Sequence, residues 1–138
     1  MLYYVDGSSS FIGREIAVTD NDGNLLLSKK YKKELTNNEL EYEAIIAALE
    51  LCENGDSIYS DSKLCVEQII GNFKIRQAHL EPYATRAKKI LETKKVTITW
   101  IPRERNLAGK YLEKKVKTNA RKRNKESKII RGSSGKKI

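Results

Sequence analysis

Apolar and polar positions over residues 1–113 alternate as in strands or recur at helical spacing, in segments separated by turn-forming residues. Three strand-like runs come first. Asp22 and Gly23 lie between the second and third runs and predict a tight hairpin turn, so we expect these strands to form an antiparallel meander. The complete pattern predicts strands at 2–7, 11–20, 25–33, 56–61 and 96–102, and helices at 36–54, 62–71, 79–95 and from residue 107 onward.

The order of these elements predicts an α/β fold. The last two strands follow helices, and a strand that is reached through a helical crossover pairs in parallel with its neighbour. We therefore expect a five-stranded mixed sheet, in which an antiparallel meander of three strands is followed by two parallel strands. Helices are expected on both faces of this sheet.

The helix at 36–54 has the clearest start signal, since Thr36 and Glu39 form a capping box. Glu41 lies in line with the apolar stripe of this helix, so it is a candidate inward-facing carboxylate. A first-turn glutamate favoured by the helix dipole is the alternative interpretation. The other glutamates of the helix fall on one stripe, which predicts a solvated face: Glu39, Glu43, Glu50 and Glu53.

Two aspartates end strand-like runs and are expected at one edge of the sheet. Asp6 ends the apolar run at the N-terminus, and Asp61 ends the strand at 56–61. Asp61 has a second interpretation as the N-cap of the next helix. If the first and fourth strands are neighbours, Asp6, Glu41 and Asp61 can converge. Converging carboxylates need hard cations to neutralise them, which predicts a site for Mg²⁺, with two ions in a phosphodiester-cleaving arrangement.

The net charge of +9 is concentrated at the C-terminus. Residues 114–138 contain 11 lysines and arginines and one acid, so the preceding part of the chain is almost neutral. Clustered basic residues displace counterions from phosphate backbones and predict a nucleic-acid partner, whereas a tail that only aids solubility is the alternative. We expect one domain over 1–113 and a basic tail over 114–138 that starts as a helix and is disordered over 131–138.

Other features argue against a membrane or secreted protein. The longest apolar run, residues 44–49, is too short to span a bilayer, and the N-terminal segment lacks the pattern of a secretory signal. Cys52 and Cys65 have no metal-ligand spacing and are expected to be reduced core residues. His79, the single histidine, is expected at a helix start or on the surface. These features together predict a cytoplasmic protein.

Four segments resemble, in their order and spacing, the ribonuclease H type 1 family in its short, reverse-transcriptase-like branch. They read YVDGSS, TNNELEYEAIIAAL, SDSKLCVEQIIG and WIPRERN, and the resemblance covers residues 1–113. It implies a ribonuclease H-like fold and an endonuclease that cuts the RNA strand of an RNA/DNA hybrid. Asp6, Glu41 and Asp61 would then be the catalytic acids, and they would bind Mg²⁺ or Mn²⁺.

The resemblance also implies a substrate surface around these acids. Asn37 and Asn38 would contact 2′-hydroxyls in the minor groove, where an amide both donates and accepts. The linker at 71–83 lacks the long basic handle of some relatives and offers a smaller phosphate contact. The complete set of candidate substrate-binding residues is Gly7, Ser8, Ser9, Asn37, Asn38, Lys74, Arg76, Arg103, Arg105 and Asn106.

One position departs from the family pattern. Relatives carry a fourth acid at the start of the last helix, in the order Asn, two residues, Ala, Asp, and this chain reads RNLAGKYLEK there. Aligning Ala108 places Gly109 at the acid's position, whereas aligning Asn106 places Lys110 there. Neither a glycine nor a lysine can bind Mg²⁺ in place of the acid.

Three interpretations of this departure stay open. Glu113 lies one turn further along and could complete the site from there. The three acids could hold metals more weakly, with a preference for Mn²⁺, while Lys110 screens charge. The domain could also bind a hybrid or structured RNA without cutting it, as a module of a ribonucleoprotein complex.

Overall fold

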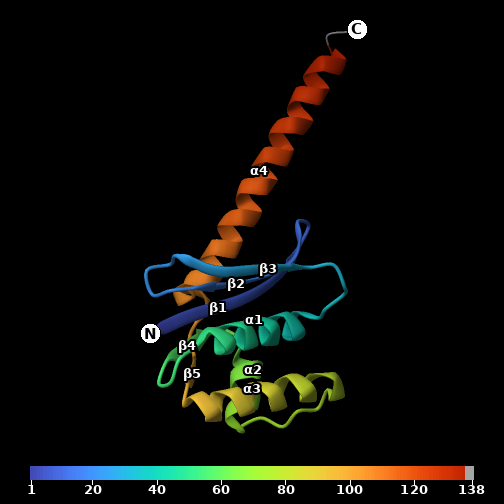
Figure 1. Cartoon of the computed structure of the whole chain (residues 1–138). Coiled ribbons are helices and arrows are strands. Elements are labelled where there is room, and N and C mark those ends of the chain that lie inside the picture. Colours follow the sequence, from blue (N-terminus) through green and yellow to red (C-terminus); the bar gives the residue numbers. More distant parts are fainter. Residues whose placement is uncertain (136–138) are drawn as a thin grey trace.

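The computed structural model describes residues 1–135 and contains one five-stranded sheet with the strand order β3-β2-β1-β4-β5 (Figure 1). The first three strands pair antiparallel, and β4 and β5 pair in parallel on the other side of β1. The mixed sheet predicted from the sequence is confirmed. The strands are β1 (Leu2–Ser10), β2 (Gly13–Thr19), β3 (Leu25–Tyr31), β4 (Ser57–Ser60) and β5 (Thr97–Trp100).

Helices cover both faces of the sheet, as predicted. Figure 1 shows α1, α2 and α3 stacked on one side of the strands, whereas α4 begins on the other side and projects away from the body. The α-helices are α1 (Asn37–Leu51), α2 (Lys63–Ile70), α3 (Glu81–Lys94) and α4 (Leu107–Gly135), and the 3₁₀ turns are η1 (Ala78–Leu80) and η2 (Arg103–Arg105).

The two faces bury very different amounts of apolar surface. The α1 side holds the main core, in which Val5 of β1 meets Leu40 and Ile45 of α1. The α4 side holds a small cluster around Ala17 and Leu112. Alternate residues of β1 point to opposite faces, so this strand contributes to both clusters and carries site residues between them.

The last helix is longer than the sequence pattern predicts. It extends from Leu107 to Gly135, so residues 131–135, which we expect to be disordered, are helical. The rest of that predicted segment, residues 136–138, lies outside the described residues. A helix of 29 residues is about 43 Å long, and most of that length extends past the sheet (Figure 1). Among the described helices, none combines the length and apolarity needed to cross a membrane.

Candidate metal centre

The pairing register of the sheet brings Asp6 and Asp61 together. Val5 of β1 lies opposite Ser60 of β4 in the parallel ladder, so the next residue of each strand, Asp6 and Asp61, follows at the same edge. The ladder ends at this pair, whereas β1 continues alongside β2 alone. A parallel register therefore places two acids from distant parts of the chain side by side.

Helix α1 adds the third acid through a direct contact between helix and strand. The Gly7 N–H donates to Glu41 Oε1 at 2.9 Å. A Cβ atom at Gly7 would lie 2.7 Å from the carbonyl carbon of Leu40, so only glycine allows this approach. The absence of a side chain at Gly7 thus allows α1 to pack against β1. The substrate contact that the resemblance implies for Gly7 would be a second role.

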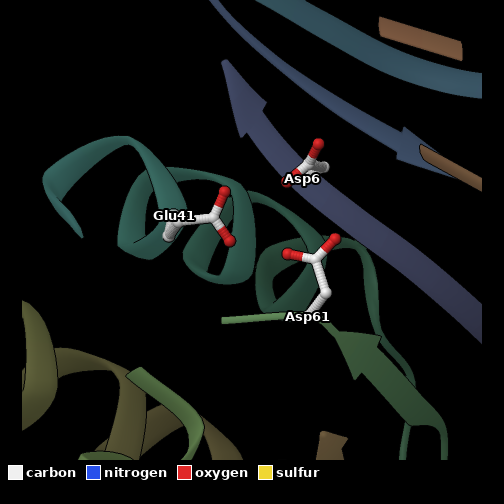
Figure 2. Close-up of side chains that lie close together, drawn as sticks. All are labelled: Asp6, Glu41 and Asp61. Atoms are coloured by element: carbon white, nitrogen blue, oxygen red, sulfur yellow. The ribbon is translucent and has the colours of Figure 1, made fainter. Parts of the chain in front are cut away.

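Asp6, Glu41 and Asp61 form one cluster, in which each contributes an oxygen within 4.8 Å of the others (Figure 2). Asp6 and Glu41 are only 7% and 9% exposed. Burial, together with the charge of Asp61, raises the pKa of Asp6 to about 6. Burial and then the charge of Asp6 raise the pKa of Glu41 well above its ordinary value. This arrangement of acids costs stability on its own and fits the binding of a cation.

One oxygen of the cluster gives independent support for a cation. Glu41 Oε2 is fully buried and has no hydrogen-bond partner among the described residues, whereas Oε1 of the same carboxylate is bonded to Gly7. An unsatisfied buried carboxylate oxygen is costly. Hard divalent cations take carboxylate oxygens as ligands, so this donor set fits Mg²⁺ or Mn²⁺. The periodicity that separates Glu41 from its neighbours therefore identifies an inward-facing acid correctly.

Asn106 holds the cluster from behind. Its Nδ2 donates to Val5 O at 2.9 Å and to Asp61 Oδ2 at 3.0 Å, and its Oδ1 accepts from the N–H groups of Ala108 and Gly109. This one side chain caps α4 and orients Asp61 at the same time. Asn106 is fully buried, so it positions Asp61 and does not offer the substrate contact that the sequence predicts.

Asp61 does not cap the next helix, which was the alternative interpretation. Ser62 is the N-cap of α2, and its hydroxyl accepts from the N–H of Cys65. The backbone carbonyl of Asp61 accepts from Trp100 Nε1 at 3.1 Å. With its backbone held by β5 and one carboxylate oxygen held by Asn106, Asp61 points into the cluster (Figure 2).

The structure decides which residue of α4 stands where relatives have a fourth acid. A Cβ atom at Gly109 would lie 3.2 Å from Asp6 Oδ2, whereas Lys110 is exposed on the outer side of the helix. The alignment through Ala108 is therefore the one that the geometry supports. The helix presents only backbone to Asp6, and Lys110 does not screen the cluster.

Glu113 is engaged elsewhere. Its carboxylate accepts from Arg103 Nε at 3.3 Å, and it does not belong to the cluster of three acids. This hydrogen bond is the main reason why the pKa of Arg103 is raised, and the charges of Asp6 and Asp61 act in the same direction. Glu113 therefore holds an arginine at the rim of the site in this structure, and the predicted role as a substitute acid is not what the geometry shows.

A hollow of about 210 Å³ opens beside Asp6 on the α4 side of β1. Ser8 lines it from the strand, Gly109 leaves it open, and Arg103 borders it. Alternation along β1 explains why Ser8, but not Ser9, shares this hollow with Asp6. The remaining lining residues are Ser10, Leu112, Glu113, Val116 and Lys117.

The other predicted substrate residues lie outside the cluster of three acids. Asn37 and Asn38 occupy the first turn of α1, with Asn37 exposed, and Ser9 and Arg105 are also exposed. Lys74 and Arg76 lie in the linker between α2 and α3, where they border a separate hollow of about 540 Å³. That hollow is further lined by Leu64, Gln68, Asn72, Phe73 and Gln77. His79 is exposed, as predicted.

Glu43 differs from the solvated role that its spacing predicts. Its carboxylate accepts from the hydroxyls of Tyr31 and Tyr83, which come from β3 and α3. Glu43 thus ties three elements together on the side of α1 away from the acids. Neither this contact nor the role of Asn106 has a local sequence signal, apart from the position of Asn106 immediately before a predicted helix.

Residues 6–116 match the sequence family described as Reverse transcriptase-like. The chain is also 30% identical over 99 residues to the bifunctional protein Rv2228c of Mycobacterium tuberculosis, a match that covers 68% of this chain and 27% of that protein. The chain thus spans about a quarter of the length of the curated relatives it matches.

The solved structures that are similar to this chain include two RNase H1 proteins. An RNase H1 of the halophilic archaeon Halobacterium salinarum NRC-1 is 26% identical, with a TM-score of 0.61, over 78% of this chain and 89% of that chain. LC11-RNase H1, solved in complex with an RNA/DNA hybrid, is 29% identical, with a TM-score of 0.59, over 76% of this chain and 87% of that chain.

Proposed function

The chain belongs to the ribonuclease H type 1 family, in its reverse-transcriptase-like branch, and on this premise we propose that it is a metal-dependent endoribonuclease that cuts the RNA strand of RNA/DNA hybrids. The observation that carries the proposal is the convergence of Asp6, Glu41 and Asp61, with the buried Glu41 Oε2 left without a partner. The close approach of three acids and the burial of Asp6 and Glu41 cost the metal-free protein stability, and bound cations would offset this cost.

In the proposed mechanism these three acids hold Mg²⁺ or Mn²⁺, in a site for two ions. The chemistry that such cations would supply there is Lewis-acid activation of water and neutralisation of charge on the leaving oxygen of a phosphodiester. The Gly7 N–H and the Asn106 amide orient Glu41 and Asp61 within the cluster, the kind of outer support that metal ligands receive.

Substrate recognition follows from the groups around the cluster. We propose that Asn37 and Asn38, in the first turn of α1, contact 2′-hydroxyls, which distinguish RNA from DNA. Arg103, oriented by Glu113, offers a charge to a phosphate close to the cut. The basic residues of α4 are proposed to bind the phosphate backbone without regard to sequence.

A second function is favoured by one observation, the absence of a carboxylate at Gly109. With the fourth acid missing, the domain would bind a hybrid or structured RNA without cutting it. The three remaining acids favour the enzyme, because a domain that only binds an anionic nucleic acid gains nothing from buried carboxylates next to it.

A cleavage assay with four substrates tests the proposal. The full chain is incubated with an RNA/DNA hybrid, single-stranded RNA, duplex RNA or duplex DNA, in Mg²⁺, in Mn²⁺ or in EDTA, with Asp6→Asn as the inactive variant. We expect cleavage of the RNA strand of the hybrid in either metal, and none in EDTA or by Asp6→Asn. Binding of the hybrid without cleavage in both metals would establish the binding module instead.

A further inference from the structure

The outer face of α4 carries a row of exposed basic side chains that starts next to the acidic cluster. Lys110, Lys114, Lys117, Arg121 and Lys125 follow one another at intervals of three or four residues, a spacing that keeps side chains on one side of a helix. All five residues are exposed. We call this row the basic stripe.

The opposite face of α4 holds the helix on the sheet and sets its rotation. Leu112 packs into the small apolar cluster, and Lys115 Nζ donates to both carboxylate oxygens of Glu15 at 2.8 Å. The guanidinium of Arg123 lies 5.7 Å from the centre of the Phe11 ring, near the turn between β1 and β2. Because these contacts occupy the sheet-facing side, the basic stripe faces away from the sheet.

The basic stripe is continuous with the candidate metal centre. The hollow beside Asp6 is bordered by Glu113 and Lys117, and the same two residues border a second hollow of about 410 Å³ on the outer side of α4. Glu113 and Lys117 therefore lie between the hollow beside Asp6 and the hollow along the stripe. The other residues that line the second hollow are Lys110, Lys114, Thr118 and Arg121.

The positive charge of the basic stripe is not neutralised within the described part of the chain. None of its five residues takes part in an ion pair there, and the nearby Glu113 is already bonded to Arg103. Glu126, the next acid along α4, lies on a different side of the helix. A row of free cations next to a candidate phosphodiester-cutting site is complementary to a nucleic-acid backbone.

The dimensions agree with that ligand. From Lys110 to Lys125 the helix rises about 22 Å, which matches about six steps of 3.4 Å along a duplex. Figure 1 shows α4 extending from the body in one direction only. A duplex that follows the stripe would therefore be gripped on one side of the acids.

We propose that the basic stripe is a track for the phosphate backbone of the same nucleic-acid duplex whose strand enters the acidic cluster, so that α4 extends the binding surface to one side of the cut. This inference rests on the proposed function for the identity of the duplex. Contacts with phosphates carry no base information, so the track is independent of sequence.

The test compares two full-length variants that lose the same charge. Lys114→Gln, Lys117→Gln and Arg121→Gln are combined to neutralise the stripe. The control combines Lys88→Gln, Lys89→Gln and Lys95→Gln, at the end of α3 that leads into the start of β5, away from the strand end that carries Asp61. Circular dichroism checks that both variants fold as the parent does.

Binding of a fluorescent RNA/DNA hybrid of about 20 base pairs is measured in EDTA between about 50 and 200 mM salt. Each lost phosphate contact lowers the slope of log K against log salt by about 0.9, so we expect the stripe variant to lose about 2 to 3 in slope and the control to keep the parental slope. A parental slope in the stripe variant, an equal change in the control, or no salt-dependent binding by the parent would overturn the track.

The same preparations, assayed for cleavage, separate this inference from the proposed function. A stripe variant that cuts hybrid and keeps the parental slope overturns the track and leaves the nuclease intact. Stripe-dependent binding by a parent that cuts nothing supports the track and contradicts the nuclease.

Discussion

The acidic cluster and the basic stripe lie next to each other, yet the fold treats them in opposite ways. Asp6 and Glu41 are buried and Asp61 is half-buried. The three acids come from β1, α1 and the end of β4, and hydrogen bonds from Gly7 and Asn106 hold Glu41 and Asp61. The basic residues lie on a single helix, are exposed, and have no ion-pair partner among the described residues. One region is largely removed from solvent, whereas the other is exposed to it.

This difference indicates how each region relates to stability and to binding. Buried like charges destabilise a fold unless a ligand neutralises them, so the acids are retained for function at a cost to the metal-free protein. Exposed lysines and arginines cost the fold little, and their number can vary without loss of structure. We therefore expect substitutions in the acidic cluster to change cleavage and the stability of the metal-free protein. Substitutions in the basic stripe should change nucleic-acid binding and leave stability almost unchanged.

The largest expected effect is on cleavage. Glu41→Gln removes a charge from the cluster but keeps its size, and we expect kcat/KM for the hybrid to fall by more than about 100-fold, because a proposed cation ligand is weakened. Glu50→Gln is the matched control on the same helix, since Glu50 is exposed and paired with Arg86. Similar activity in the two variants would contradict the assignment of Glu41.

Removing the group that positions Asp61 should affect both stability and activity. Asn106→Ala leaves the carbonyl of Val5 and the start of α4 without their partner, so we expect the free energy of unfolding to fall by about 2 to 3 kcal/mol in urea titrations. Activity should fall as well, at saturating metal and in conditions where the variant is folded. Full activity in the folded variant would show that Asp61 needs no such support.

The metal-free protein should become more stable when an acid is removed. The folded pKa of Asp6, about 6, lies above its ordinary value, so the folded state keeps a proton that the unfolded state has lost. The free energy of unfolding in EDTA therefore falls as pH rises from the ordinary pKa of an aspartate, 3.8, through about 6, and it levels off only about one unit above pH 6.

Asp6→Asn should remove a penalty on the order of 2 kcal/mol at pH 7.5 and flatten this pH dependence. Lys114→Gln, in the basic stripe, should change stability by less than about 0.5 kcal/mol. Thermal melts of both variants in EDTA at pH 5 and pH 7.5 measure the difference. A variant Asp6→Asn that is less stable than the parent at pH 7.5 would contradict the account of the cluster.

The smallest expected effect concerns the missing fourth acid. Gly109→Asp places a carboxylate beside Asp6, and we expect roughly a tenfold lower Mg²⁺ concentration for half-maximal cleavage, in line with the contribution of groups that support a metal site. Lys110→Asp is the matched control, since Lys110 points outward. A gain from Lys110→Asp alone would mean that residue 110, and not residue 109, faces Asp6.

Much of this organisation could be predicted from local sequence patterns. The spacing of apolar residues separates Glu41 from its neighbours, and the end of a strand identifies Asp61, because these signals depend on residues a few positions away. The predicted strand end after Asp6 is wrong, because β1 continues to Ser10, and only its ladder with β4 ends there. The capping box at Thr36 is likewise present as predicted. The mixed sheet follows from the order of strands and helical crossovers.

The remaining features depend on contacts between distant segments. The two acceptors of the Asn106 Nδ2 group are 101 and 45 residues away, and the carboxylate of Glu43 accepts from hydroxyls of two other elements. The choice between Gly109 and Lys110 depends on the rotation of α4 about its axis, which the anchoring contacts of its sheet-facing side determine. None of these contacts leaves a pattern in the nearby sequence.

Calorimetric titration of the full chain with Mn²⁺, in the absence of nucleic acid, measures directly whether Asp6, Glu41 and Asp61 bind a metal. The parent and Glu113→Gln should bind the metal alike, because Glu113 is bonded to Arg103 and lies outside the cluster. Asp6→Asn should lose most of the binding. Equal binding by Asp6→Asn and the parent, or a loss confined to Glu113→Gln, would contradict a metal centre built from Asp6, Glu41 and Asp61.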